Sequence, residues 1–274
     1  MSPEFISAGL KTTERESVGL ALFRSFNRWH GIVLCCAALI STIWLALTNQ
    51  LVLYIHPRYV VFTVIMAVLA LLLVIAGVAR RPGLHDHESN DSKSYPAVRR
   101  LVSAVATILT VAISLALIVV PPATLTAATA DQRVINSTAV SAGTKSVSSA
   151  ASAASGASVK FSVLDWSSLL RQSTDAGFYS SKPVDVVGFI TKDPDDQANM
   201  FYLSRFVITC CAVDAQPVGV AVYLANWEGS FKKNEWVHVT GVFNTNPSIR
   251  SQQAIALVPN ETKRVSQPSD PYLY

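Results

Sequence analysis

The chain of 274 residues is 50% hydrophobic and only 15% charged, whereas roughly a quarter of the residues in soluble domains are charged. This composition indicates that part of the protein lies in lipid. The net charge of +4 comes from residues 1–159, which hold twelve Lys and Arg against seven Asp and Glu, because residues 160–274 hold ten against eleven. A near-neutral C-terminal half lacks the basic surface that binds nucleic acid, so we expect no nucleic-acid partner.

Three long uncharged segments follow a polar N-terminal region. Residues 1–30 end in an aromatic and basic run, which is typical of a cytoplasmic tail that meets a membrane surface. Residues 31–121 are expected to form a membrane domain with three transmembrane helices, because residues 31–55, 59–79 and 101–120 carry no charge and each run is long enough for a bilayer core that takes roughly 20 residues. The helices are predicted at about 31–47, 59–79 and 100–120.

The boundary between the first two helices is marked by polar residues and a proline. The triplet Thr48-Asn49-Gln50 interrupts the first apolar run, so we expect the first helix to end near Leu47. Pro57 suits the first turn of the second helix, where a missing N–H costs nothing.

Basic residues flank the three segments unequally. Four lie in the N-terminal tail, one lies between the first two segments, and five lie between the second and the third. The positive-inside rule then places the N-terminus in the cytoplasm and everything after Pro121-Pro122 outside. The small residues Ala128-Thr129-Ala130 leave open a release of the C-terminal domain by a signal peptidase that cuts after Ala130.

The remaining sequence divides into a linker and a β domain. Residues 122–159 are rich in Ser and Ala and are predicted to form a flexible linker. Residues 160–274 are predicted to form an extracytoplasmic all-β domain, because their apolar residues recur with a period of two. Strand-like runs occur at Val184–Ile190, Met200–Cys210, Val218–Leu224, Trp236–Phe243 and Ala254–Val258. Five short strands, two of them containing glycine, favour an OB-like five-stranded barrel, with a β-sandwich fragment as the alternative.

The adjacent cysteines Cys210 and Cys211 lie in the second of these runs. If the strand continues through them, they face opposite sides of the sheet. We therefore predict that Cys210 is buried with Phe206 and Ile208 and that Cys211 lies nearer the surface. Two core thiols are the alternative interpretation.

The stretch from Arg205 to Gly219, Arg-Phe-Val-Ile-Thr-Cys-Cys-Ala-Val-Asp-Ala-Gln-Pro-Val-Gly, resembles the signature of the YcgQ-like family of bacterial membrane proteins. The run Tyr54-Ile55-His56-Pro57-Arg58 resembles the motif of the same family between its first two spans. The resemblance implies an accessory or regulatory subunit of a two-component permease in the bacterial cell membrane, with a multi-span permease as its partner. An external domain would bind or gate that partner. The functional candidates in these two stretches are His56, Arg58, Arg205, Cys210, Cys211 and Asp214.

Two other functions stay open. His85, His87 and Glu88 carry donor atoms suited to zinc or another divalent metal, so a membrane-anchored metal-handling protein is the first alternative, through this loop or through the cysteine pair. The plain interpretation of the loop is a hydrophilic cytoplasmic connection. The sequence contains no Walker loop, nucleophile elbow, CxxC or HExxH motif. We therefore expect no enzyme, and a membrane enzyme without a recognisable motif is the third possibility.

Overall fold

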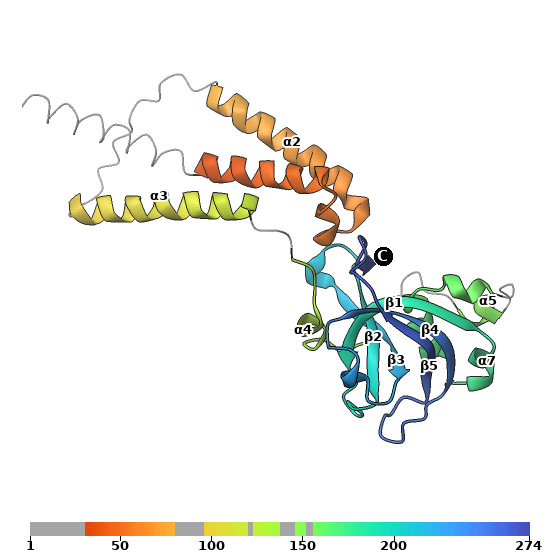
Figure 1. The fold of residues 1–274 in the computed structure, drawn as a ribbon. Coiled ribbons are helices and arrows are strands. Elements are labelled where there is room, and N and C mark those ends of the chain that lie inside the picture. Colours follow the sequence, from red (N-terminus) through yellow and green to blue (C-terminus); the bar gives the residue numbers. More distant parts are fainter. Residues whose placement is uncertain (1–30, 80–95, 120–122, 138–145, 152–155) are drawn as a thin grey trace, which may run out of the picture. The chain divides into compact units, whose positions relative to one another are not determined.

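The computed structural model describes residues 31–79, 96–119, 123–137, 146–151 and 156–274, which form two compact units (Figure 1). The helical unit comprises the described residues up to Leu51 and those of Arg58–Pro122. The β unit comprises Val52–Pro57 and the described residues of Ala123–Tyr274. A short segment between two helices therefore belongs to the same compact unit as the C-terminal half of the chain.

The helical unit contains a helix at Gly31–Leu47, α2 at Pro57–Ala79 and α3 at Pro96–Val119. Among the described residues, α2 is the one helix that is both long and apolar enough to cross a membrane, with a mean hydropathy of 3.0. Gly31–Leu47 and Ala104–Ala116 are shorter apolar helices. A helical N-terminal region with one clear apolar helix is therefore established, and the three-span arrangement stays a prediction.

The end of the first helix follows from its polar triplet. Asn49 adopts the left-handed conformation with φ 56°, and the Gln50 N–H donates to the Leu45 carbonyl at 2.8 Å. This is the usual way to close a helix with a residue of positive φ. Leu47 is the last residue of the first helix, and Pro57 is the first residue of α2.

The β unit is built on a six-stranded sheet with the order β1-β4-β5-β3-β2-β6, in which β1 also pairs with β2. The pairs β3–β5 and β2–β6 are parallel, and the others are antiparallel. The strands are β1 Pro183–Lys192, β2 Met200–Val207, β3 Gln216–Tyr223, β4 Trp236–Thr245, β5 Ile255–Arg264 and β6 Tyr272–Leu273. All five predicted strands are present. The sixth was not predicted, because two residues are too short to show a period.

Two glycines let neighbouring strands approach closely. A Cβ on Gly241 would lie 2.3 Å from the Val258 carbonyl oxygen, and a Cβ on Gly188 would lie 2.7 Å from the Ser204 carbonyl oxygen. Gly241 also follows directly on the register shift between β4 and β5. Both positions therefore require glycine, as expected where a sheet bends strongly.

Short helices cover one side of the sheet and bury an aromatic cluster. Trp166 in α6 (Val163–Gln172), Tyr179 in α7 (Ala176–Ser180) and Phe243 are all buried. The Trp166 and Phe243 rings lie 5.1 Å apart. Ser162 and Asp165 form a capping box at the start of α6, which fixes where this helix begins. The other short elements are η1 Leu51–Leu53, α5 Val147–Ala151, η2 Ala157–Lys160, η3 Ala212–Asp214 and η4 Trp227–Gly229.

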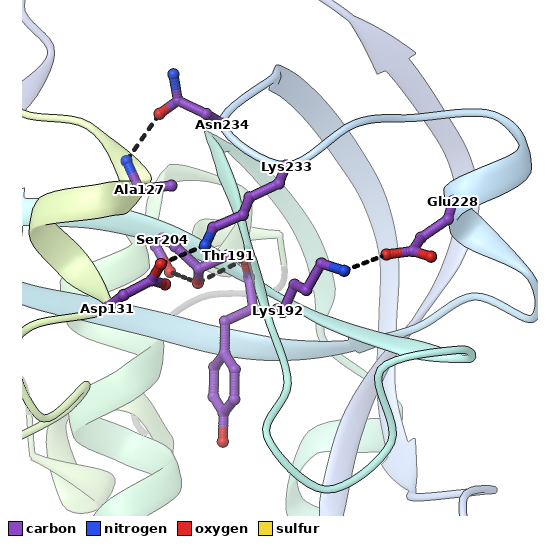
Figure 2. Close-up of polar contacts among 9 residues, drawn as sticks. Ala127, Asp131, Thr191, Lys192, Ser204, Glu228, Lys233 and Asn234 are labelled. Atoms are coloured by element: carbon purple, nitrogen blue, oxygen red, sulfur yellow. Dashed lines mark hydrogen bonds and ion pairs between the residues drawn. The ribbon is translucent and has the colours of Figure 1, made fainter.

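Part of the segment predicted as a linker packs against the sheet. Figure 2 shows that the Ala127 N–H of α4 (Ala127–Ala130) donates to Asn234 Oδ1 at 2.7 Å and that Asp131 pairs with Lys233. Ala130 is fully buried. Residues 123–137 are thus part of the β unit, and cleavage after Ala130 would require α4 to unfold first.

Candidate functional site

The two stretches singled out by the sequence are joined by backbone hydrogen bonds within the β unit. The His56 N–H donates to the Cys210 carbonyl at 2.9 Å, and the Ala212 N–H donates to the Tyr54 carbonyl at 2.8 Å. Ile55 and Cys211 therefore form an antiparallel β-bridge. We call Val52–Pro57 the docked loop. It ends at the residue with which α2 begins.

The docked loop can pair here because β2 stops at Val207. The Asp214 carboxylate accepts hydrogen bonds from the backbone N–H groups of Thr209 (3.2 Å) and Cys210 (2.7 Å). A side chain that takes these donors turns the backbone away from the sheet. The Cys210 carbonyl and the Ala212 N–H are then left for the docked loop.

The predicted burial of Cys210 is wrong, and so is the alternative of two core thiols. Cys210 is exposed, Cys211 is half-buried, and the two form no disulfide. Because the strand ends before the pair, the two side chains do not alternate between faces, and their Sγ atoms lie 3.6 Å apart. Phe206 and Ile208 remain in the core without them.

Asp214 also controls the protonation of the exposed thiol. The hydrogen bond of the Cys210 thiol to the Asp214 carboxylate, with a smaller effect from Cys211, raises the pKa of Cys210 to about 12. Burial would raise the pKa of Asp214, but the hydrogen bonds from Cys210, Thr209 and Cys211 outweigh it and lower that pKa. At neutral pH the site therefore holds a carboxylate and a protonated thiol.

Arg205 is a structural clamp. Its guanidinium donates to the carbonyls of Asp270 (2.6 Å), Pro271 (2.9 Å), Val187 (3.3 Å) and Tyr272 (3.4 Å) and lies 5.3 Å from the centre of the Trp236 ring. Burial lowers its pKa. These contacts hold the segment with β6 against β1 and β2. Arg205 therefore has a structural role, because it fixes the C-terminal segment that contacts the docked loop.

The C-terminal aromatic residues complete the site, and the sequence did not point to them. The Tyr274 ring lies 4.9 Å from the His56 ring in an edge-on arrangement, and its hydroxyl donates to the Val52 carbonyl at 3.4 Å. Leu53 packs against the buried cluster that contains Phe206 and Tyr272. The signal that could have found this segment is its pair of aromatic residues, Tyr272 and Tyr274, because so short a strand shows no period.

Of the remaining candidates, one belongs to the helical unit and three lie outside the described residues. Arg58 belongs to the helical unit, where its guanidinium lies 5.9 Å from the centre of the Tyr59 ring. His85, His87 and Glu88 lie outside the described residues. Among the residues that the structure describes, no group of three or more His, Cys, Asp and Glu side chains is arranged to hold a metal ion.

A small cavity of about 80 Å³ lies elsewhere in the β unit. Its lining includes Ser167, Arg171, Tyr202 and Gln253. This volume suits a few water molecules and is far below that of ordinary ligand pockets. The docked loop and the Cys210–Asp214 turn therefore form the candidate site.

Comparison with known proteins gives two family matches and one relative. The relative is a Streptococcus mutans protein described as a "Putative two-component membrane permease complex subunit", which is 27% identical over 97 residues. The aligned stretch spans 35% of this chain and 35% of the relative. The DUF1980 N-terminal domain matches residues 30–136, and the DUF1980 C-terminal domain matches residues 146–274. In agreement with its resemblance to the YcgQ-like proteins, the chain belongs to the DUF1980 family.

Proposed function

We propose that the protein is a non-enzymatic accessory subunit of a bacterial two-component membrane permease. Support comes from the family and from the name of the Streptococcus mutans relative. In this proposal the helical unit anchors the chain in the cell membrane, and the β unit binds or gates a multi-span permease.

The proposed arrangement keeps three membrane-spanning helices, a cytoplasmic N-terminus and an external β unit. The apolar helix α2 supports insertion in the membrane. The β unit is proposed to be an OB-like barrel with β6 as an addition. The pairing of β1 with both β4 and β2, together with the parallel pair β3–β5, supports this topology.

The observation that carries the proposal is the bridge between the docked loop and the Cys210–Ala212 backbone. The loop is fixed to the β unit and runs directly into α2. A partner that moves the turn at Cys210–Asp214 would therefore move the first residue of α2. This linkage suits a subunit that passes a signal between an external domain and a membrane helix.

A single substitution in the turn can remove one hydrogen bond of the bridge. Ala212 is the first residue of η3 and donates its N–H to Tyr54. Proline is tolerated at the first position of a helical turn. Cys211 already has the extended conformation that precedes proline, with φ −155° and ψ 168°. Ala212→Pro thus removes one hydrogen bond, whereas Ala212→Ser keeps the donor.

The test is co-purification of the tagged full chain from bacterial membranes in mild detergent, followed by mass spectrometry. We expect the wild type and Ala212→Ser to carry a stoichiometric multi-span permease and Ala212→Pro to carry several-fold less. A wild-type chain without such a partner would refute the proposed function. Equal recovery of the permease with Ala212→Pro and with the wild type would show that the bridge plays no part in permease binding.

Divalent-metal handling is the second candidate, and the distance between the cysteine sulfurs favours it. Two thiolates on a tetrahedral zinc ion with bonds of about 2.3 Å are about 3.8 Å apart, close to the observed 3.6 Å. Asp214 adjoins the pair, and the loop with His85, His87 and Glu88 is a separate candidate ligand set.

Zinc titration of the full chain tests metal binding, with a double Cys210→Ser, Cys211→Ser variant and a double His85→Ala, His87→Ala variant measured beside the wild type. Binding that survives both double variants, or no binding at all, would exclude these residues.

A further inference from the structure

Three residues with exposed side chains belong to the docked loop or to segments hydrogen-bonded to it. Val213 is 82% exposed, Tyr274 is 45% exposed and Tyr54 is 38% exposed. They come from three separate segments of the chain, and we call them the outer patch. None of the three side chains carries a charge at neutral pH.

The contacts of these segments hold the outer patch in place. Tyr54 is bonded through its carbonyl to Ala212, the neighbour of Val213. The Val213 carbonyl accepts a hydrogen bond from Arg133 Nη2 at 3.2 Å, and Tyr274 is bonded to Val52. Single exposed apolar residues are common on protein surfaces. Here, however, the exposed valine and the two exposed tyrosines come from segments that hydrogen bonds hold together.

The chain itself limits how far the outer patch lies from α2. Tyr54 precedes Pro57, the first residue of α2, by three positions, which is at most about 10 Å of extended chain. The polar layer on each side of a bilayer is about 6 Å thick. If α2 crosses the membrane with Pro57 at the edge of the hydrocarbon core, Tyr54 lies within or just above this layer, and the segments with Val213 and Tyr274 are hydrogen-bonded to the same loop.

We propose that the outer patch contacts the lipid bilayer at its polar interface, with the Tyr54 and Tyr274 rings at headgroup level and Val213 inserted beside them. Tyrosine suits this place because it combines an apolar ring with a polar tip, and it is enriched at membrane surfaces. The proposal rests on the membrane insertion included in the proposed function. It adds that the β unit holds one defined edge against the lipid.

The test uses a photo-crosslinking amino acid, benzoylphenylalanine, placed at one position at a time in the full chain. The test position is Val213, where so exposed a side chain can be replaced without disturbing the fold. The positive control is Trp44, which is 59% exposed on the apolar helix Gly31–Leu47. The matched control is Ile249, which is fully exposed in the β unit.

Ile249 is a suitable control because it lies far from the outer patch. Trp236, at the start of β4, and Leu53 of the docked loop both pack against the buried cluster that contains Tyr272. Ile249 follows the other end of this ten-residue strand, about 30 Å away. In Figure 1 the loop between β4 and β5 lies at the opposite end of the β unit from the C-terminus.

After irradiation of membrane vesicles, lipid adducts are identified by mass spectrometry. We expect adducts at positions 44 and 213, with several-fold fewer at 249. Adducts at 44 without adducts at 213, or crosslinks from 213 to protein alone, would overturn the lipid contact and leave the membrane anchor intact. Equal labelling at 213 and 249 would also overturn it. No lipid adduct at 44 would overturn the proposed membrane insertion, and this inference with it.

Discussion

The Asp214 carboxylate lies 2.7 Å from the backbone nitrogen of Cys210, and the thiol of the same cysteine is also bonded to it. One side chain thus determines both the backbone path and the protonation of residue 210. The Cys210 carbonyl accepts a hydrogen bond from the His56 N–H of the docked loop. Asp214 therefore influences the bridge through Cys210. The first two predictions follow from this pair.

Asp214→Asn should make the Cys210 thiol reactive. The thiol pKa of about 12, against an ordinary 9.0, leaves little thiolate at pH 8. Its return toward 9.0 would raise the thiolate fraction by about two to three orders of magnitude. A thiolate of lower pKa is a weaker nucleophile, so we expect the alkylation rate to rise by about tenfold or more.

Iodoacetamide labelling of Cys210, followed by mass spectrometry in a Cys211→Ser background, measures this rate. Asp131→Asn is the control, because Asp131 pairs with Lys233 outside the turn. Equal rates in the two variants would contradict a thiol held by Asp214.

Asp214 should also make the stability of the β unit depend on pH. Its pKa is lowered from 3.8 in the folded protein, so its contribution is present above that value and is lost as the pH falls through the folded pKa. At pH 7 we expect Asp214→Asn to cost about 1 kcal/mol, since two backbone donors lose a charged acceptor. Below pH 3.8 the difference from the wild type should shrink. Thermal unfolding in detergent, followed by tryptophan fluorescence, checks this, and a pH-independent difference would refute it.

The sequence pattern located β1 to β5 as apolar runs between turn residues. In β4 the side chains alternate in burial, whereas β2 and β3 are buried along almost their whole length. The sequence pattern placed the end of β5 at Val258, six residues before Arg264, since the second half of that strand is largely exposed and polar. Its register there comes from backbone pairing with β4, which an apolar pattern does not report.

The candidate site was only half predictable. The resemblance named both stretches, but their contact consists of backbone hydrogen bonds between segments about 155 positions apart, and side-chain patterns carry no trace of it. The burial of Cys210 was mispredicted for a related reason. Asp214 competes for the N–H groups of Thr209 and Cys210, and this local competition ends a strand that the apolar pattern would continue.

Arg205→Lys should loosen β6. A lysine ammonium cannot reproduce the planar set of donors that reaches four carbonyls. We expect the free energy of unfolding to fall by about 2 kcal/mol. Hydrogen exchange should also become faster at the Ile208 N–H, which donates to the Leu273 carbonyl at 3.0 Å. Arg264→Lys is the control, because Arg264 is an exposed residue that pairs with Glu235. Unchanged exchange at Ile208 in Arg205→Lys would show that the clamp does not hold β6.

Gly241→Ala should destabilise the β unit. The new Cβ would lie 2.3 Å from the Val258 carbonyl oxygen and 2.9 Å from the Pro259 Cα, which are backbone atoms of the paired strand and cannot turn aside. Separating β4 from β5 at the register shift should cost about 2 to 3 kcal/mol, which corresponds to a Tm lower by about 5 to 10 °C in a domain of this size. At Gly229 the nearest atom to a new Cβ is a side-chain nitrogen of Asn226 at 3.3 Å, and this flexible amide can move. Gly229→Ala, measured by the same thermal unfolding in detergent, should therefore change Tm little, and equal losses in the two variants would contradict a specific close approach at Gly241.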